Sequence, residues 1–281
     1  MTEWFSRGEL IKAISANDRG LQYGDGLFET IAIRDGELRL WGYHLARLRK
    51  GCETLGLWMP SDDVLLEGVM HALRNSESTA IAAVAKIIIT AGEGSRGYGR
   101  TGNASPSTLF AVFPAAPYQA AAYRDGIDLA LCHTRLAVGS VTAGLKTLNR
   151  LEQVLARTEF AETELIEGLT MDADDNIICG TMSNVFFIKD RMVHTPSLDR
   201  CGVEGVMRRH VITCLEKQGI ATNIRRIKIA EMSDFDEVFI SNSQFGVLPV
   251  RRCTDVRWGV ADRTREIMSV MADNGVAECL S

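Results

Sequence analysis

The sequence lacks the features that mark several large classes of protein. Its seven cysteines include no Cys-x-x-Cys pair, and its five histidines show no short ligand spacing. A disulfide framework or a structural zinc site is therefore not expected, and we expect no metal. Basic residues are fewer than acidic ones, 31 against 36. This balance argues against nucleic acid as a partner.

Long hydrophobic runs are also missing. The longest apolar stretch, Ile81 to Thr90, is short and carries Lys86 in its middle. It cannot cross a bilayer, which needs about 20 apolar residues. The N-terminus has no cationic region followed by an apolar one, so no secretory signal is expected. These absences predict a cytoplasmic protein that does not associate with membranes.

What the chain does contain is an alternation of strand and helix patterns over 281 residues. Residues 27–33 predict a strand that enters a hairpin at Asp35-Gly36. Residues 44–57 and 61–73 predict helices, with Ser61 as the N-cap of the second. The other expected strands are 10–14, 38–41, 81–90, 108–113, 127–134, 185–188 and 237–241, and the other expected helices are 149–163, 204–218 and 261–273.

Two prolines close together, Pro114 and Pro117, predict an extended connection. The strand and helix pattern restarts beyond them. We therefore expect two α/β domains, one over residues 1–115 and one over residues 116–281.

The glycine-rich segment Gly92-Glu-Gly-Ser-Arg-Gly97 matches a dinucleotide-binding pattern by letter. That pattern requires a helix after its third glycine and an acidic residue about 20 positions further on, and both are missing here. Two interpretations remain. The loop, which runs to Gly102, is either a mobile substrate flap that carries Arg96 and Tyr98 or a plain surface hairpin.

Lys146 is one of only seven lysines and lies between a small-residue turn and an amphipathic helix. A lysine in a partly apolar pocket can lose its proton near neutral pH and is suited to forming a Schiff base. From the residues alone, a solvated lysine on a turn is the alternative.

The segment Lys146-Thr-Leu-Asn-Arg-Leu-Glu-Gln resembles the cofactor-lysine segment of fold-type IV pyridoxal-phosphate enzymes, and of the aminodeoxychorismate lyases in particular. The resemblance covers nearly the whole chain in order. The further segments that carry it are Asn17-Asp-Arg-Gly-Leu-Gln-Tyr-Gly-Asp-Gly-Leu-Phe-Glu-Thr30, His44-Leu-Ala-Arg47-Leu, Gly94-Ser-Arg-Gly-Tyr98, Gly202-Val-Glu-Gly-Val-Met-Arg208 and Ile240-Ser-Asn-Ser243. It implies a two-domain fold of the D-amino-acid aminotransferase type, whose C-terminal domain carries the lysine.

The resemblance also implies pyridoxal 5′-phosphate as cofactor. Lys146 would hold it covalently and act as general base, and Arg47 would bind its phosphate. The other implied cofactor contacts are Asn149, Cys179, Gly205, Val206, Met207, Ser241, Asn242 and Ser243. Arg47 could instead be one charge on a solvated helix face, and Asn149 could simply begin a helix.

The implied reaction converts 4-amino-4-deoxychorismate to 4-aminobenzoate and pyruvate, a step of folate biosynthesis. Tyr23, Arg96 and Tyr98 are the candidates for the substrate pocket, because arginine is a natural partner for the two carboxylates of the substrate. Thr30 would line the reacting face, or else fill a strand position in the core. A class IV aminotransferase of D- or branched-chain amino acids is the alternative activity, and a homodimer is the expected assembly.

Cys179 departs from the family pattern. Many relatives place a glutamate five residues before the asparagine that corresponds to Asn184, where it binds the pyridine nitrogen. A neutral thiol cannot hold that nitrogen protonated as a carboxylate does. The departure predicts a weaker electron sink and little aminotransferase activity, unless Cys179 merely fills a small apolar gap.

Overall fold

The computed structural model of the chain describes residues 2–76, 81–100 and 106–280, and it divides into two compact units. The first comprises residues 1–116 and 145–149, and the second comprises residues 117–144 and 150–281. The sequence places the lysine segment in the C-terminal domain, whereas Leu145–Asn149 packs with the first unit because its backbone pairs with an N-terminal strand. The last two residues of the expected glycine-rich loop, 101 and 102, lie outside the described residues.

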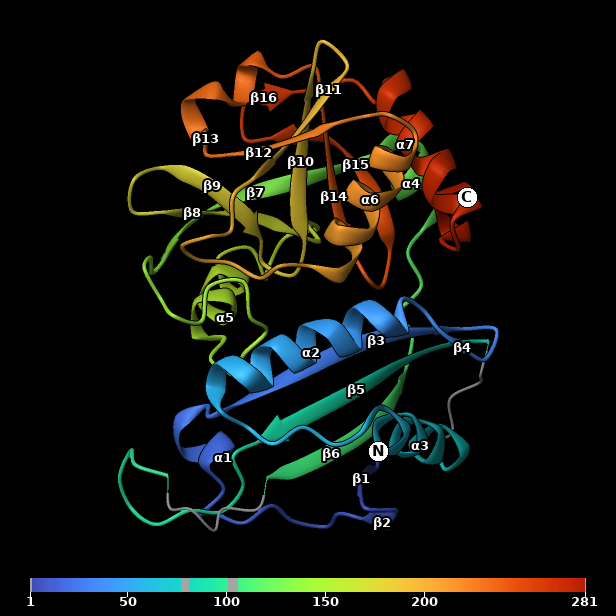
Figure 1. Cartoon of the computed structure of the whole chain (residues 1–281). Coiled ribbons are helices and arrows are strands. Elements are labelled where there is room, and N and C mark those ends of the chain that lie inside the picture. Colours follow the sequence, from blue (N-terminus) through green and yellow to red (C-terminus); the bar gives the residue numbers. More distant parts are fainter. Residues whose placement is uncertain (1, 77–80, 101–105, 281) are drawn as a thin grey trace. The chain divides into compact units, whose positions relative to one another are not determined.

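The first unit contains a six-stranded antiparallel sheet with the order β2-β1-β6-β5-β3-β4 (Figure 1). Its strands are β1 (Trp4–Ser6), β2 (Glu9–Leu10), β3 (Gly26–Arg34), β4 (Glu37–Leu38), β5 (Ala82–Thr90) and β6 (Ser107–Pro114). Its helices are α1 (Arg19–Tyr23), α2 (Trp41–Leu55) and α3 (Asp62–Arg74).

The core of this unit lies between one face of the sheet and the helices α2 and α3. Alternate residues of β3, namely Leu27, Ile31 and Ile33, are buried in it together with Leu48 of α2 and Leu65 of α3. Successive strand residues point to opposite faces, so residues 28 and 30 lie on the other face of the sheet. This alternation decides which side chains are available for chemistry.

The second unit is built on a ten-stranded mixed sheet with the order β12-β11-β10-β14-β15-β7-β8-β9-β13, and β16 pairs with β15. Its strands are β7 (Ile127–Leu136), β8 (Gly168–Asp172), β9 (Asn176–Gly180), β10 (Asn184–Lys189), β11 (Met192–Pro196), β12 (Thr222–Arg225), β13 (Ile227–Lys228), β14 (Glu237–Asn242), β15 (Gly246–Cys253) and β16 (Val256–Arg257). Its helices are α4 (Ala120–Asp125), α5 (Leu151–Thr158), α6 (Val206–Lys217) and α7 (Asp262–Asp273), with 3₁₀ turns η1 (Ile229–Asp234) and η2 (Ala277–Leu280).

Three of the expected elements are much shorter in the structure. The expected strand 10–14 is reduced to Glu9–Leu10, because Leu10 and Ile14 are exposed and find no core to cover. The expected strand 38–41 stops at Leu38, and α2 begins at Trp41. Helix α5 ends at Thr158 rather than at residue 163.

All seven cysteines are buried and carry free thiols. Six of them lie in the second unit, and only Cys52, on α2, lies in the first. None of the helices within the described ranges is long and apolar enough to cross a membrane. The same residues contain no group of three or more His, Cys, Asp or Glu side chains arranged to hold a metal ion.

Candidate active site

Lys146 lies beside the first residues of β3. Its carbonyl accepts a hydrogen bond from the Phe28 amide (3.0 Å), and the Leu148 amide donates to the Gly26 carbonyl (3.0 Å). Between these bonds, Thr147 pairs with Leu27 and is buried with it. Lys146 therefore points to the opposite face, where its Nζ lies 4.2 Å from the centre of the Phe28 ring.

Two further polar side chains share this face of the sheet. Thr30 lies two residues beyond Phe28 and is paired with Lys86 of β5. The Nζ of Lys86 lies 5.3 Å from the centre of the Phe28 ring, and burial lowers the pKa of this lysine. The face thus carries two amines and one hydroxyl around a single aromatic ring.

The sequence interpretation did not select Lys86. The signal for it was present, because Lys86 is the only charged residue in the apolar run 81–90. Burying a lysine in such a strand costs free energy unless its amine binds a partner or reaches water.

On the core side of the same strand, Glu29 binds two residues of α2. Its carboxylate accepts from Arg47 Nε (2.8 Å) and Nη2 (2.5 Å) and lies 2.6 Å from His44 Nδ1. Burial raises the pKa of Glu29, but the Arg47 guanidinium and His44 outweigh it and hold the pKa at about 2. Arg47 is therefore oriented by a buried carboxylate and is not a solvated helix charge.

The residues nominated for the substrate pocket lie around the loop that follows β5. Tyr98 is 87% exposed and Arg96 is also exposed, while the ring of Tyr23 meets that of Tyr98 edge-on at 5.5 Å. The Asn149 amide donates to the Tyr23 carbonyl (3.2 Å). This bond gives Asn149 a role in holding the backbone before Gly24.

In the second unit, two nominated segments offer donors to an anion. Gly205 is the N-cap of α6, and no side chain caps the helix there. A side chain at Gly205 would collide with the Asn184 amide oxygen, so the close approach of backbone requires glycine. The first amides of a helix and its dipole favour a negative charge. This is the arrangement with which helices bind phosphate.

The segment Ser241–Ser243 lies where β14 ends. The Ser241 hydroxyl is fully buried and has no hydrogen-bond partner among the residues that the structure describes. Such a group costs free energy unless a ligand satisfies it. The Asn242 side chain instead accepts from the amides of Gln244 (2.8 Å) and Phe245 (3.0 Å) and so forms the turn.

Cys179, in β9, is 5% exposed and lies 3.6 Å from Thr170 Oγ1. Burial raises the pKa of its thiol to about 11. Glu167, an acid that influences this thiol electrostatically, is fully buried. It accepts hydrogen bonds from Thr181, Met182 and Ser183 and so holds the turn before β10. The position that the family pattern gives to a carboxylate is held here by a neutral thiol.

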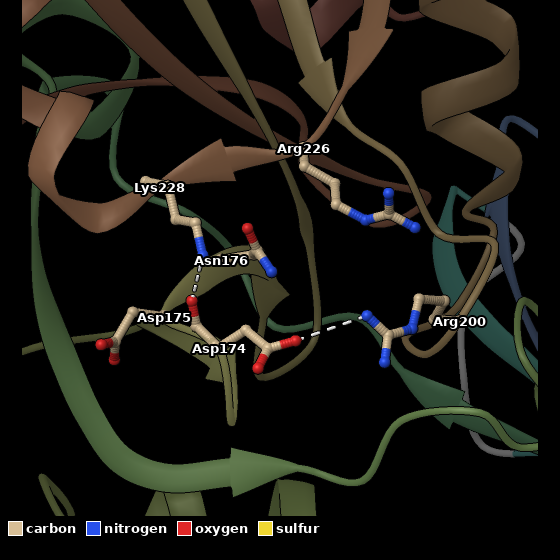
Figure 2. Close-up of a pocket in the computed structure, with 6 residues that line it drawn as sticks. All are labelled: Asp174, Asp175, Asn176, Arg200, Arg226 and Lys228. Carbon is tan, nitrogen blue, oxygen red and sulfur yellow. Dashed lines mark hydrogen bonds and ion pairs between the residues drawn. The ribbon is translucent and has the colours of Figure 1, made fainter.

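A separate open pocket of about 720 Å³ lies over the turn between β8 and β9 (Figure 2). Its charged side chains face one another: Asp174 is 3.4 Å from Arg200, and the Lys228 amine donates to the Asp174 carbonyl. It contains none of the nominated residues. Exposed ion pairs of this kind contribute little to the stability of a fold.

The chain is similar to known proteins over most of its length. The model of the amino-transferase class IV family matches residues 26–253. The aminodeoxychorismate lyase of Vibrio harveyi is 37% identical over 84% of this chain and 86% of its own length. The D-alanine aminotransferase of Bacillus licheniformis is 24% identical over 85% of this chain and 82% of its own.

Solved structures show the same relationship. The crystal structure of 4-amino-4-deoxychorismate lyase from Pseudomonas aeruginosa superposes with a TM-score of 0.88 at 40% identity, covering 97% of this chain and 99% of that one. A branched-chain amino acid aminotransferase of Escherichia coli shares the fold, with a TM-score of 0.87 at 23% identity, over 98% of this chain and 95% of that one. The chain belongs to the amino-transferase class IV family.

Proposed function

We propose that this chain is a pyridoxal 5′-phosphate-dependent aminodeoxychorismate lyase, which converts 4-amino-4-deoxychorismate to 4-aminobenzoate and pyruvate. The observation that carries the proposal is a contrast in identity. Two lyases are 37% and 40% identical to the chain, whereas a D-alanine aminotransferase that covers a similar share of it is 24% identical. Lyase activity would place the protein in the synthesis of 4-aminobenzoate for folate.

The second unit fits the phosphate of the cofactor. Two groups supply donors: the start of α6 at Gly205–Met207, which no side chain caps, and the buried Ser241 hydroxyl, which has no hydrogen-bond partner in the described part of the chain. Ser243 and the turn built by Asn242 complete this cradle. A phosphate satisfies both needs at once.

The chain just before Lys146 is hydrogen-bonded to the segment that leads into α6. Gly144, two residues earlier, pairs with Val203: its amide donates to the Gly202 carbonyl (3.0 Å), and its carbonyl accepts from the Glu204 amide (2.9 Å). Two residues span at most about 7 Å. Lys146 thus lies two residues along the chain from Gly144, which is hydrogen-bonded to the segment that leads into α6.

Arg47 is the proposed second contact to the phosphate, with Glu29 as the group that orients it. Two of its nitrogens bind Glu29. A guanidinium has five N–H donors in a planar fork, a geometry that matches the oxygens of a phosphate.

When bound, the cofactor supplies an electron sink for the carbanion formed at the substrate. The Lys146 amine removes the proton from the ring carbon that bears nitrogen, and the Thr30 hydroxyl lines the same side. Lys86 is added to Tyr23, Arg96 and Tyr98 as a contact to the substrate carboxylates. A cation in a half-buried position binds a carboxylate more strongly than an exposed one.

Cys179 is the proposed neighbour of the pyridine nitrogen, and a neutral thiol there favours elimination over amino-group transfer. Aromatisation drives elimination downhill, whereas transamination has no such help. Asn149 contributes to the site through Tyr23, whose carbonyl it binds. A homodimer in the cytoplasm is the proposed state.

The test is product formation by the purified protein loaded with pyridoxal 5′-phosphate. With 4-amino-4-deoxychorismate we expect 4-aminobenzoate and pyruvate in equal amounts. With D-alanine or a branched-chain amino acid and 2-oxoglutarate we expect little transfer. Rapid transfer without 4-aminobenzoate would assign the aminotransferase activity instead.

A further inference from the structure

Arg19, the first residue of α1, is a buried arginine whose side chain binds the backbone of the loop 97–99. Nη1 donates to the Gly97 carbonyl (2.9 Å) and the Gly99 carbonyl (3.5 Å), and Nη2 donates to the Tyr98 carbonyl (2.8 Å). The side chain is only 4% exposed. One guanidinium therefore fixes three consecutive residues that are 78 to 80 positions away in sequence.

Asp25 holds this guanidinium from the other side. Its carboxylate accepts from Arg19 Nε (2.9 Å) and from Arg100 Nε (3.0 Å), and Arg100 also donates to the Leu55 and Gly56 carbonyls at the end of α2. Burial raises the pKa of Asp25, but Arg100 and Arg19 outweigh it and lower the pKa. The carboxylate is ionised at neutral pH and links Arg19, which binds the loop, to Arg100, which follows it.

The start of the loop is tied to the residues around Arg19. The Asp18 carboxylate accepts from Thr90 Oγ1 (2.7 Å), and the Arg19 amide donates to the Gly92 carbonyl (2.8 Å). A Cβ at Gly94 would come within 2.8 Å of Arg19 Cδ, so glycine is needed where the Arg19 side chain packs against the loop backbone. Gly97 has a φ of 105°, a backbone angle that residues other than glycine rarely adopt.

The loop thus combines a fixed backbone with exposed side chains. Tyr98 is 87% exposed although its carbonyl is bound by a buried arginine. The Gly97 amide also donates to the Tyr23 hydroxyl (3.4 Å), and the Arg19 guanidinium lies 4.9 Å from the centre of the Tyr23 ring. A plain surface hairpin without a function would not need the buried Arg19 guanidinium to fix its backbone.

We propose that Arg19 is a positioning residue for substrate binding: with Asp25 it holds the loop 97–99 in one conformation, so that Arg96 and Tyr98 meet the substrate already ordered. The proposal rests on the proposed function, in which those two side chains contact the substrate carboxylates. Arg19 itself is too buried to touch substrate. It acts through the loop.

Arginine is required for this task by its geometry. A planar guanidinium presents donors in a fixed fork, and here the fork reaches a carboxylate and three carbonyls. A lysine carries the same charge but has three donors on one atom, so it cannot reach all four. Ordering the backbone of one loop residue costs about a tenfold factor in binding, which a preformed loop avoids.

The experiment compares Arg19→Lys with Arg49→Lys in the loaded enzyme. Arg49 is 48% exposed and pairs with Asp62 on the surface, which makes it a control for the same chemical change. For Arg19→Lys we expect KM for 4-amino-4-deoxychorismate to rise about tenfold or more, with cofactor affinity unchanged and faster amide hydrogen exchange at residues 97–100. Arg49→Lys should change none of these.

A double variant separates a local from a general effect. If Arg19 acts through the loop, Arg19→Lys should raise KM much less in an Arg96→Ala background, because the side chain that it positions is gone. Should Arg19→Lys fail to fold, Asp25→Asn tests the same cluster and should raise KM by a smaller factor.

The outcomes are distinguishable. A wild-type enzyme that forms no 4-aminobenzoate overturns the proposed function and this inference with it. An active wild type in which Arg19→Lys and Arg49→Lys share the wild-type KM overturns the positioning role alone. Equal loss of cofactor affinity and substrate affinity in Arg19→Lys overturns it too, because a specific effect on the loop would spare the cofactor.

Discussion

Replacing Glu29 with glutamine removes the charge of a carboxylate that is 1% exposed and keeps its shape. The pKa of Glu29 is about 2 in the folded chain, against an ordinary value of 4.5. That difference corresponds to about 3 kcal/mol, at about 1.4 kcal/mol per tenfold change in the dissociation constant. Removing one partner of a buried pair costs about 3–5 kcal/mol, because the other charge stays buried. We expect Glu29→Gln to lower the free energy of unfolding at pH 7 by about 3 kcal/mol.

The pH dependence gives the sign of the effect. A carboxylate with a lowered folded pKa stabilises the protein above its unfolded value of 4.5 and loses this contribution as the pH falls toward 2. The difference in stability between wild type and variant should therefore be constant above about pH 5 and shrink below it. Burial lowers the pKa of His44, so the imidazole is neutral at pH 7 and Arg47 supplies the positive charge that faces the carboxylate.

The assay is urea unfolding followed by tryptophan fluorescence. Three of the four tryptophans, at positions 4, 41 and 58, belong to the first unit, which also contains Glu29. Glu67→Gln is the control, because Glu67 is 69% exposed in its pair with Arg74 and should contribute at most about 1 kcal/mol. Equal unfolding free energies for the Glu29 and Glu67 variants would refute the reasoning, as would a difference from wild type that does not depend on pH.

Three more predictions concern the cofactor. Lys146→Ala should lose the yellow absorption of the bound cofactor and reduce 4-aminobenzoate formation by about a thousandfold or more. The reason is that the substitution removes both the covalent attachment point of the cofactor and the general base. A yellow, fully active variant would contradict this prediction. Arg47→Ala should weaken cofactor affinity about ten- to hundredfold, as measured by titration. Lys12→Ala, at an exposed position, should leave that affinity unchanged. Equal cofactor affinities for the two variants would exclude the phosphate contact. Cys179→Glu should raise amino-group transfer from D- and L-amino acids, since a carboxylate can hold the pyridine nitrogen protonated; brisk transfer in the wild type, unchanged in the variant, would show that this position does not limit the reaction.

Local signals in the sequence predicted much of the fold correctly. Ser61 caps α3 by accepting from the Val64 amide, and the hairpin at Asp35-Gly36 joins β3 to β4. The sequence predicts an amphipathic helix over residues 149–163, and in α5 the apolar residues Leu151, Val154 and Leu155 are all more than half exposed. Periodicity identifies an apolar face without identifying what covers it.

The sequence could predict the candidate site only where a motif carried it. The lysine segment and the two phosphate-binding segments were nominated by resemblance, and the structure adds the reasons that favour them, such as the buried Ser241 hydroxyl. Lys86, Glu29 and Arg19 were not nominated. Their roles depend on pairing between β3 and β5 and on contacts 18 to 80 residues apart, which no local pattern encodes.

Because every thiol is buried, the rate of thiol labelling measures how often the native structure opens. A thiol-specific reagent reacts with a thiolate that it can reach, and burial both shields these sulfurs and raises the pKa of Cys52 to about 11 and of Cys132, Cys201 and Cys253 to about 12. Labelling of the native protein should therefore occur only when local or global unfolding exposes a thiol. Because one thiol lies in the first unit and six lie in the second, the count of modified cysteines at each time reports which unit opened.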